Sequence, residues 1–187
     1  MDPKELFRHS LSQAEHCVRL VQDDQLTNDT PCTDWNLHDL VGHMVYELMW
    51  LPEIAEGKTV KEVGDRFDGD LLGKDIQAAW DRASHNALAA VEKADSKATA
   101  HLSYGDVSMF DYIDEMARDM MIHGWDVGQS INCNLIFEPE VLKTMYDYVL
   151  PRKDRFAKSG LFGKPVDVPE SATLQTKFLA LVGRKAG

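Results

Sequence analysis

The residues best suited to chemistry lie in the stretch Asp111–Ile131, where Asp119 and His123 stand four positions apart. At helical spacing, two such side chains lie one turn above the other, with their Cβ atoms about 6 Å apart. A carboxylate and an imidazole held in this way can both reach a single ion. The spacing therefore predicts part of a metal site.

The helix predicted for this stretch is apolar over most of its surface. Such a helix is expected to be largely buried, so a narrow polar stripe on it would face a cavity. The alternative is a solvated acidic edge, which suits an acidic chain. The apolar positions are Phe110, Ile113, Ala117, Met120, Met121 and Trp125, and the polar stripe is Glu115, Asp119, His123 and Asp126.

A second histidine, His43, lies on a helix predicted to begin at Asn36 and to be closed by Pro52 and the following Gly57. Glu47 and Trp50 follow one and two turns later on the same side, so His43 would face a space bounded by an acid and an aromatic ring. A histidine beside an apolar face is often simply packed and hydrogen bonded. This helix alone leaves both interpretations of His43 open.

Composition excludes several partners. The 187 residues carry 20 Lys and Arg against 31 Asp and Glu, a formal net charge of -11, and the acids are spread along the chain. This balance argues against nucleic acid and anionic membranes as partners. The sequence has neither a signal-peptide pattern nor an apolar run of about 18 residues, so we expect a soluble protein. A length of 187 residues suits a single domain over residues 1–187.

The three cysteines show no pairing pattern. Cys17, Cys32 and Cys133 are odd in number and widely spaced, which argues against a disulfide framework and against a thiolate zinc site. We therefore expect a reducing, cytoplasmic location.

Four long amphipathic helices would position the candidate residues. They are expected at about 2–24, 36–56, 74–95 and 108–134, with a long connection at 56–74 and an extended crossing loop or short hairpin at 97–109. A further helix starts at Pro139, and residues 157–187 form an irregular tail with a short terminal helix capped by Ser171. The predicted fold is an all-α four-helix bundle with a long crossing loop and a short C-terminal helical extension. Sites in such bundles are built from inward side chains on facing helices, which suits His43 and the Asp119/His123 pair.

Three ordered motifs resemble a known family. They are TPCTDWNLHDLVGHMV, DMMIHGWDVGQSIN, and FGKPVDVPESA followed by LVGR. The first two are similar to the N-terminal domain of mycothiol-dependent maleylpyruvate isomerase, within the wider DinB/YfiT-like group of metal-binding helical bundles. The third is typical of short actinobacterial proteins of this type.

The resemblance implies a metal site and a thiol cosubstrate. In the family, a histidine on the second helix and an acid plus a histidine on a later helix bind a divalent metal, usually zinc, which maps onto His43, Asp119 and His123. Three protein ligands leave a position at which a thiolate or water can bind. The implied thiol is mycothiol, whose thiolate would be the nucleophile. Two differences are expected to alter the isomerase chemistry: Asp119 stands where the isomerase has the longer glutamate, and the isomerase carries a further C-terminal domain.

The leading functional hypothesis is a metal-dependent thiol transferase or isomerase. Glu47 or Asp126 would carry a proton or support a ligand histidine, and Trp35 and Trp125 would line the substrate pocket. The alternatives are a metal-dependent hydrolase that uses bound water and a non-catalytic metal or small-molecule binding module. A small-molecule substrate and a thiol are the expected partners, and a homodimer is left open.

Overall fold

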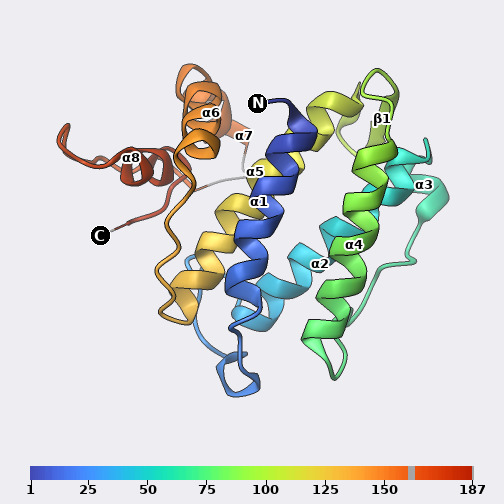
Figure 1. The fold of residues 1–187 in the computed structure, drawn as a ribbon, viewed down its shortest axis with the longest axis horizontal. Helices are drawn as coiled ribbons and strands as arrows, with labels where there is room; N and C mark the ends of the chain where they lie inside the picture. The colour runs from blue at the N-terminus through green and yellow to red at the C-terminus, as the bar shows by residue number, and fades with distance from the viewer. Residues whose placement is uncertain (160–162, 187) are drawn as a thin grey trace. The chain divides into compact units, whose positions relative to one another are not determined.

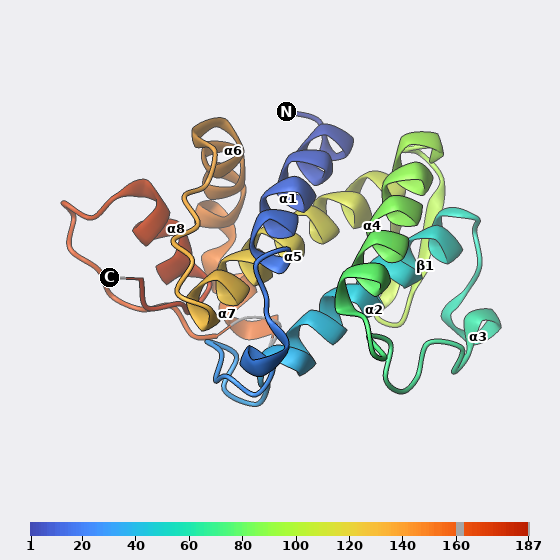
Figure 2. The ribbon, with the colours of Figure 1, turned by 60° about the horizontal axis from the view of Figure 1, so that its bottom comes forward.

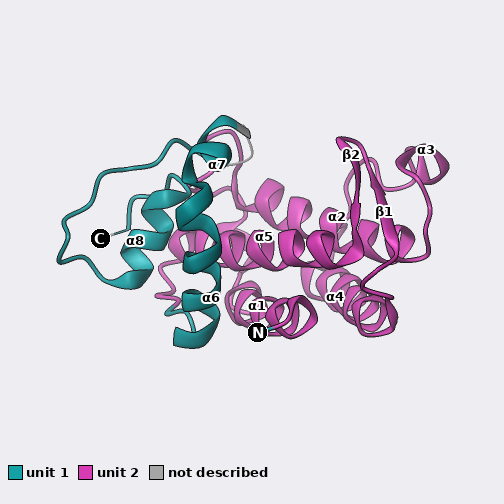
Figure 3. Ribbon diagram, turned by 90° about the horizontal axis from the view of Figure 1, so that it is seen from above, with its two compact units in different colours: residues 1, 136–187 teal, residues 2–135 magenta. Residues whose placement is uncertain are grey.

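The computed structural model describes residues 1–159 and 163–186 (Figure 1). The chain divides into two compact units, residues 2–135 and residues 136–187 with Met1 (Figure 3). Within the described ranges, no helix is long and apolar enough to cross a membrane. A single domain over 1–187 stays a prediction, and residues 160–162 and 187 of the expected tail lie outside the described residues.

The larger unit is a bundle of four long helices, as predicted. α1 packs against α5, and α2 packs against both α4 and α5. Figure 2 shows α1 lying along α5. The bounds are α1 Pro3–Val18, α2 Leu37–Ala55, α4 Ile76–Lys93 and α5 Met109–Ser130.

Side-chain caps start all four helices. The Asp2 carboxylate accepts hydrogen bonds from the Lys4 and Glu5 N–H groups, and Asp75 and Ser108 cap α4 and α5 in the same manner. Asn36 and Asp39 form a reciprocal capping box at the start of α2. Each cap satisfies backbone N–H groups that have no partner inside the helix. The α2 and α5 caps thus fix where the two site-bearing helices begin.

The connections between helices contain short regular elements. α3, Val60–Val63, is the helical turn expected in the long connection before α4. β1, Thr99–Leu102, and β2, Gly105–Ser108, form an antiparallel hairpin with Thr99 opposite Ser108. Of the two forms predicted for this crossing segment, the hairpin is therefore the one that occurs.

The first helix ends earlier than predicted. α1 stops at Val18, and a 3-10 turn, η1, follows at Asp23–Gln25. Leaving the helix lets the chain bury Val21, while Leu20 stays half exposed. The apolar residues Val18 and Val21 are both buried, but only Val18 is helical. The sequence pattern alone could not distinguish a buried residue after the helix from a continuation of the helix.

Two glycines on α5 allow α1 to approach closely. A Cβ added at Gly124 would lie 2.7 Å from the Ala14 Cα atom. A Cβ at Gly128 would lie 3.2 Å from the Cys17 sulfur and 2.8 Å from the Cys133 carbonyl oxygen. The glycines therefore set the depth at which α5 packs.

The smaller unit contains α6 Pro139–Val149, η2 Leu150–Arg152, α7 Lys153–Ser159 and α8 Leu174–Leu181. α6 packs against α8. α8 is capped by Thr173 and not by Ser171. The last three residues of α7 lie in the tail, 157–187, that was predicted to be irregular. Pro151 is tolerated because it sits in the first turn of η2, where its missing N–H needs no partner.

Candidate functional site

The fold brings His43, on α2, against Asp119 and His123, on α5. The two imidazole rings meet edge to face, with centroids 5.1 Å apart. Asp119 lies between them, one oxygen 3.4 Å from His123 Nε2 and the other 3.7 Å from His43 Nε2. The polar stripe of α5 thus faces inward, because Asp126 is fully buried, His123 is 7% exposed, and Asp119 is half-buried.

The donor set fits a divalent metal ion. One donor atom from each of the three residues lies within 4.8 Å of the other two. The Asp119 Oδ2 atom is buried and has no hydrogen-bond partner within residues 1–159 and 163–186. A buried carboxylate oxygen without a partner is costly, and a bound cation would satisfy it. Two imidazoles and one carboxylate at this separation are a suitable set for zinc, which binds such donors at about 2.0–2.2 Å.

Without an ion, the same cluster is a network of opposite charges. Burial alone would raise the pKa of Asp119, but His123 and His43 hold it well below its usual value. Burial alone would lower the pKa of His123, but Asp119 and Asp126 raise it well above the ordinary range. A metal that binds here must therefore displace a proton from His123, so metal affinity should fall as the pH is lowered.

Asp126 orients His123. Its Oδ2 atom lies 3.0 Å from His123 Nδ1, so Nδ1 donates the hydrogen bond and Nε2 is directed toward Asp119. Ligand histidines commonly have such a partner, which fixes the tautomer and the ring position. Asp126 was predicted either to carry a proton or to support a ligand histidine, and its contact with His123 favours the second role.

Cys32 also belongs to the site, and the sequence analysis did not identify it as a site residue. Its sulfur lies 3.4 Å from Asp126 Oδ2 and 3.8 Å from His123 Nδ1. Donor atoms of these three residues also lie within 4.8 Å of one another, so they form a second possible metal group. That group requires His123 Nδ1, which already bonds Asp126, whereas Asp119 Oδ2 has no hydrogen-bond partner among the described residues. The His43 side is therefore the better metal position.

The loop before α2 holds Cys32 and Trp35 over the helices. The Trp35 N–H donates to the Cys32 carbonyl oxygen, and the Thr30 hydroxyl donates to the Trp35 carbonyl oxygen. The Asn28 side chain donates to the Ser130 carbonyl oxygen at the end of α5. These bonds turn the TPCTDW segment into a folded cover over the histidines.

The two tryptophans predicted to line the pocket differ in their surroundings. The Trp35 ring lies 4.6 Å from the His43 ring and 6.0 Å from the His123 ring, centroid to centroid. Trp125 is buried two residues after His123 on α5, about 200° around the helix. A hollow beside His43 has Trp35, but not Trp125, in its lining. A pocket role for Trp125 stays a prediction.

Glu47 lies one turn after His43 on α2 and interacts electrostatically with the cluster. Burial, together with the Asp119 carboxylate, raises the pKa of Glu47 to about 7, although His43 and His123 act in the opposite direction. A carboxyl group with this pKa can take up and release a proton near neutral pH.

A hollow of about 580 Å³ opens beside His43. Trp35, Tyr46 and Phe67 give it aromatic walls, and Asp39, Asp68 and Asp70 place carboxylates in its lining. Of the three candidate ligands, His43 alone is part of this lining, so a molecule in the hollow would meet the cluster from the α2 side.

Comparisons with known proteins identify the family of the chain. The family model described as the mycothiol maleylpyruvate isomerase N-terminal domain matches residues 7–128, which include all three candidate ligands. Two uncharacterized proteins of Mycobacterium tuberculosis, from strains CDC 1551 / Oshkosh and H37Rv, are each 29% identical over 143 residues, covering 75% of this chain and 74% of the relative. No solved structure matches the chain significantly.

Proposed function

Since the chain belongs to the mycothiol maleylpyruvate isomerase N-terminal domain family, we propose that it is a zinc-dependent enzyme that activates a low-molecular-weight thiol, such as mycothiol. The ligands are His43, Asp119 and His123. The observation that carries the proposal is the buried Asp119 oxygen that lies near two imidazole rings and has no hydrogen-bond partner among the described residues. The reaction is a thiol transfer or an isomerisation.

The residues around the ligands have distinct tasks. When bound, the ion lowers the pKa of a thiol or water that occupies its free position. Asp126 holds His123 in the tautomer that directs Nε2 at the ion. Glu47, with a pKa of about 7, accepts the proton that a thiol releases.

The hollow beside His43 is the proposed place for the organic part of the substrate. Trp35 lies against His43 and can exclude water from the reacting atoms while offering an aromatic face. The small-molecule substrate and the thiol are the proposed partners. The chain's cysteines, which follow no pairing pattern, support action in a reducing cytoplasm.

Zinc titration of the purified protein tests the site. The wild type is expected to bind about one ion per chain, and His43→Ala or His123→Ala should abolish this binding while the helical circular dichroism survives. Asp119→Asn should weaken binding by about tenfold or more because an anionic ligand is lost. Asp119→Glu should retain binding if the cavity accepts one more methylene. His85→Ala, which removes an exposed histidine of α4, is the matched control.

Two further measurements separate the alternatives. Cys32→Ser should leave zinc affinity nearly unchanged; a loss as large as that of Asp119→Asn would move the metal to the Cys32 side of His123. A screen of the zinc-loaded protein with thiol-dependent substrates, compared with ester and amide hydrolysis, distinguishes thiol chemistry from a hydrolase. Stoichiometric zinc with neither activity would identify a binding module, and undiminished zinc binding in the His43→Ala/His123→Ala double variant would refute the site.

A further inference from the structure

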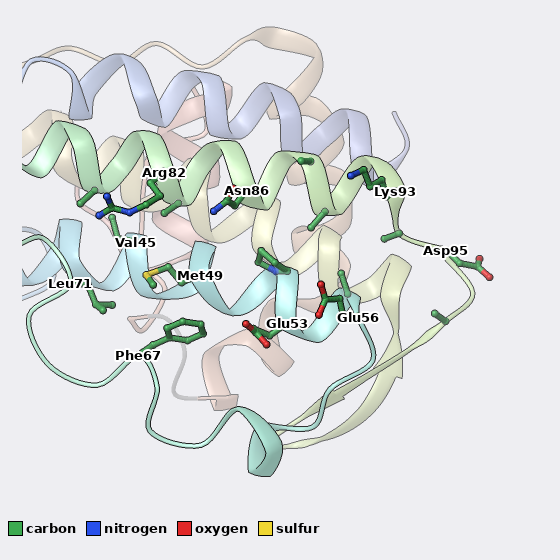
Figure 4. Close-up of a pocket in the computed structure, with 18 residues that line it drawn as sticks. Val45, Met49, Glu53, Glu56, Phe67, Leu71, Arg82, Asn86, Lys93 and Asp95 are labelled. Atoms are coloured by element: carbon green, nitrogen blue, oxygen red, sulfur yellow. The ribbon is translucent and has the colours of Figure 1, made fainter.

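A second hollow of about 590 Å³ lies between α2, α4 and the connection that follows α3. Figure 4 shows Arg82 and Asn86 on α4, Val45 and Met49 on α2, and Phe67 on the connection, all lining it. Of the residues lining the His43 hollow, it shares only Phe67 and Leu71. It is therefore a separate site for which the proposed function has no use.

The groove exists because one face of α4 is built from alanine. Ala79, Ala83 and Ala90 line it, and their short side chains leave space where larger residues would have met α2. Met49 and Phe67 supply the facing apolar wall, and a flexible methionine adapts to the shape of an apolar chain. The volume falls within the range of small-molecule sites, about 300–1,000 Å³.

One end of the groove carries cationic and amide donors. Arg82 and Asn86 are four residues apart on α4, so their side chains lie on the same face, and both line the groove. Among the described residues, Arg82 forms no ion pair, whereas Arg8, Arg19, Arg66 and Arg118 pair with Glu92, Asp81, Glu53 and Asp114. An arginine fork without an acidic partner is suited to a carboxylate, and the Asn86 amide can add a hydrogen bond.

Two of the three acids that line the groove are paired with cations, whereas the third, Asp95, forms no ion pair among the described residues. Glu53, on α2, pairs with Lys58 and Arg66, each at 2.6 Å, and Glu56 pairs with Lys58 at 2.9 Å. These pairs offset the negative charge along the α2 wall. An anion at Arg82 would therefore meet less negative charge than the net charge of the whole chain suggests.

We propose that this groove binds an aliphatic carboxylate, with the head group on Arg82 and Asn86 and the hydrocarbon chain between the alanine face of α4 and Met49 and Phe67. The proposal is independent of the metal site. It requires neither a bound ion nor catalysis.

Calorimetric titration of metal-free protein with dodecanoate tests the proposal. Arg82→Glu should weaken binding by about tenfold or more, since a charge-assisted bond is lost and a like charge is added. Ala90→Phe, which fills the groove at a half-buried position, should also abolish binding. Lys61→Glu makes the same charge change on α3, outside the lining, and should bind like the wild type.

A cationic chain of equal length, dodecyltrimethylammonium, provides the control for nonspecific apolar binding. It should bind more weakly than dodecanoate, and His43→Ala should leave dodecanoate binding unchanged. Equal binding of the two amphiphiles, equal dodecanoate affinity in Arg82→Glu, or no binding to the wild type would overturn the proposal. None of these results bears on zinc binding, so the two sites can fail separately.

Discussion

The two sides of α5 are packed in opposite ways. Toward α1, a Cβ added at Gly124 would lie 2.7 Å from the Ala14 Cα atom, and one added at Gly128 would lie 3.2 Å from the Cys17 sulfur. Toward α2, Asp119 and His123 meet His43 through ring and ion-pair distances of 3.4–5.1 Å. One carboxylate oxygen there has no hydrogen-bond partner in the described part of the chain.

The difference indicates how one helix can serve both stability and chemistry. Close packing of small residues against α1 leaves α5 little freedom to shift or rotate, because interiors at this density transmit displacements. A site whose ligands must be held within fractions of an ångström benefits from a rigid backbone. The tight side therefore positions the polar side, and the two should respond differently to substitution.

The largest effect is expected on the tight side. Gly124→Ala should lower the free energy of unfolding by about 1–3 kcal/mol, because the new methyl group must displace the Ala14 backbone. Gly42→Ala on α2 is the matched substitution, since its nearest heavy atom is the Leu72 Cδ1 atom at 4.0 Å. It should stabilise the protein by about 0.5–1 kcal/mol through helix propensity. Urea denaturation of both variants measures the contrast; similar changes would remove the distinction between the two sides.

A smaller effect is expected within the polar side, where Asp126 orients His123. Asp126→Asn should reduce zinc affinity about 10–100-fold while the helical signal is retained, because the partner that orients the imidazole loses its charge. Asp106→Asn tests the specificity of this effect: Asp106 pairs with His101 at 2.8 Å in the hairpin. Zinc affinity should be unchanged in that control. An equal affinity in Asp126→Asn would show that His123 needs no such support.

The smallest effect is a pH dependence carried by Glu47. Its pKa is raised from 4.5 to about 7 by folding, so between these values the unfolded chain releases the proton that the folded protein retains. The free energy of unfolding of the metal-free protein should therefore fall as the pH rises through this window, by at most about 1.4 kcal/mol per pH unit from this group. Glu47→Gln should fall less steeply than the wild type.

Denaturation of metal-free protein at several pH values between 4.5 and 7 measures this slope. Glu140→Gln, at an exposed position of α6, controls for the loss of one carboxyl group and should keep the wild-type slope. Parallel curves for Glu47→Gln and the wild type would mean that burial of Glu47 does not perturb its titration.

Local patterns were sufficient for the helices and for one pair of ligands. The apolar repeats predicted all four long helices, since this signal acts within a few residues, and the structure shows side-chain caps at their starts. The placement of Asp119 and His123 on one face follows from 3.6 residues per turn alone. Periodicity did not predict the end of α1 at Val18, because a buried Val21 after the helix looks like a continuation of it.

Tertiary structure decided which side chains meet. Cys32 lies 91 residues from His123 in the chain and sits in a loop, where no periodicity marks the direction of a side chain, yet folding places its sulfur 3.8 Å from the His123 ring. Asp126 and His123 are three residues apart, so their proximity was predictable, but the burial that makes their bond structurally important depends on α1, α2 and the loop. The close packing of α5 against α1 likewise depends on Ala14 facing Gly124, and this contact could not be predicted from the sequence. The amino-acid sequence by itself thus determined helices, caps and the spacing of one ligand pair, since these depend on neighbours along the chain. The third ligand's contact with that pair, the cover formed by Cys32 and Trp35, and both hollows required the packed bundle, because they arise between residues that only folding brings together.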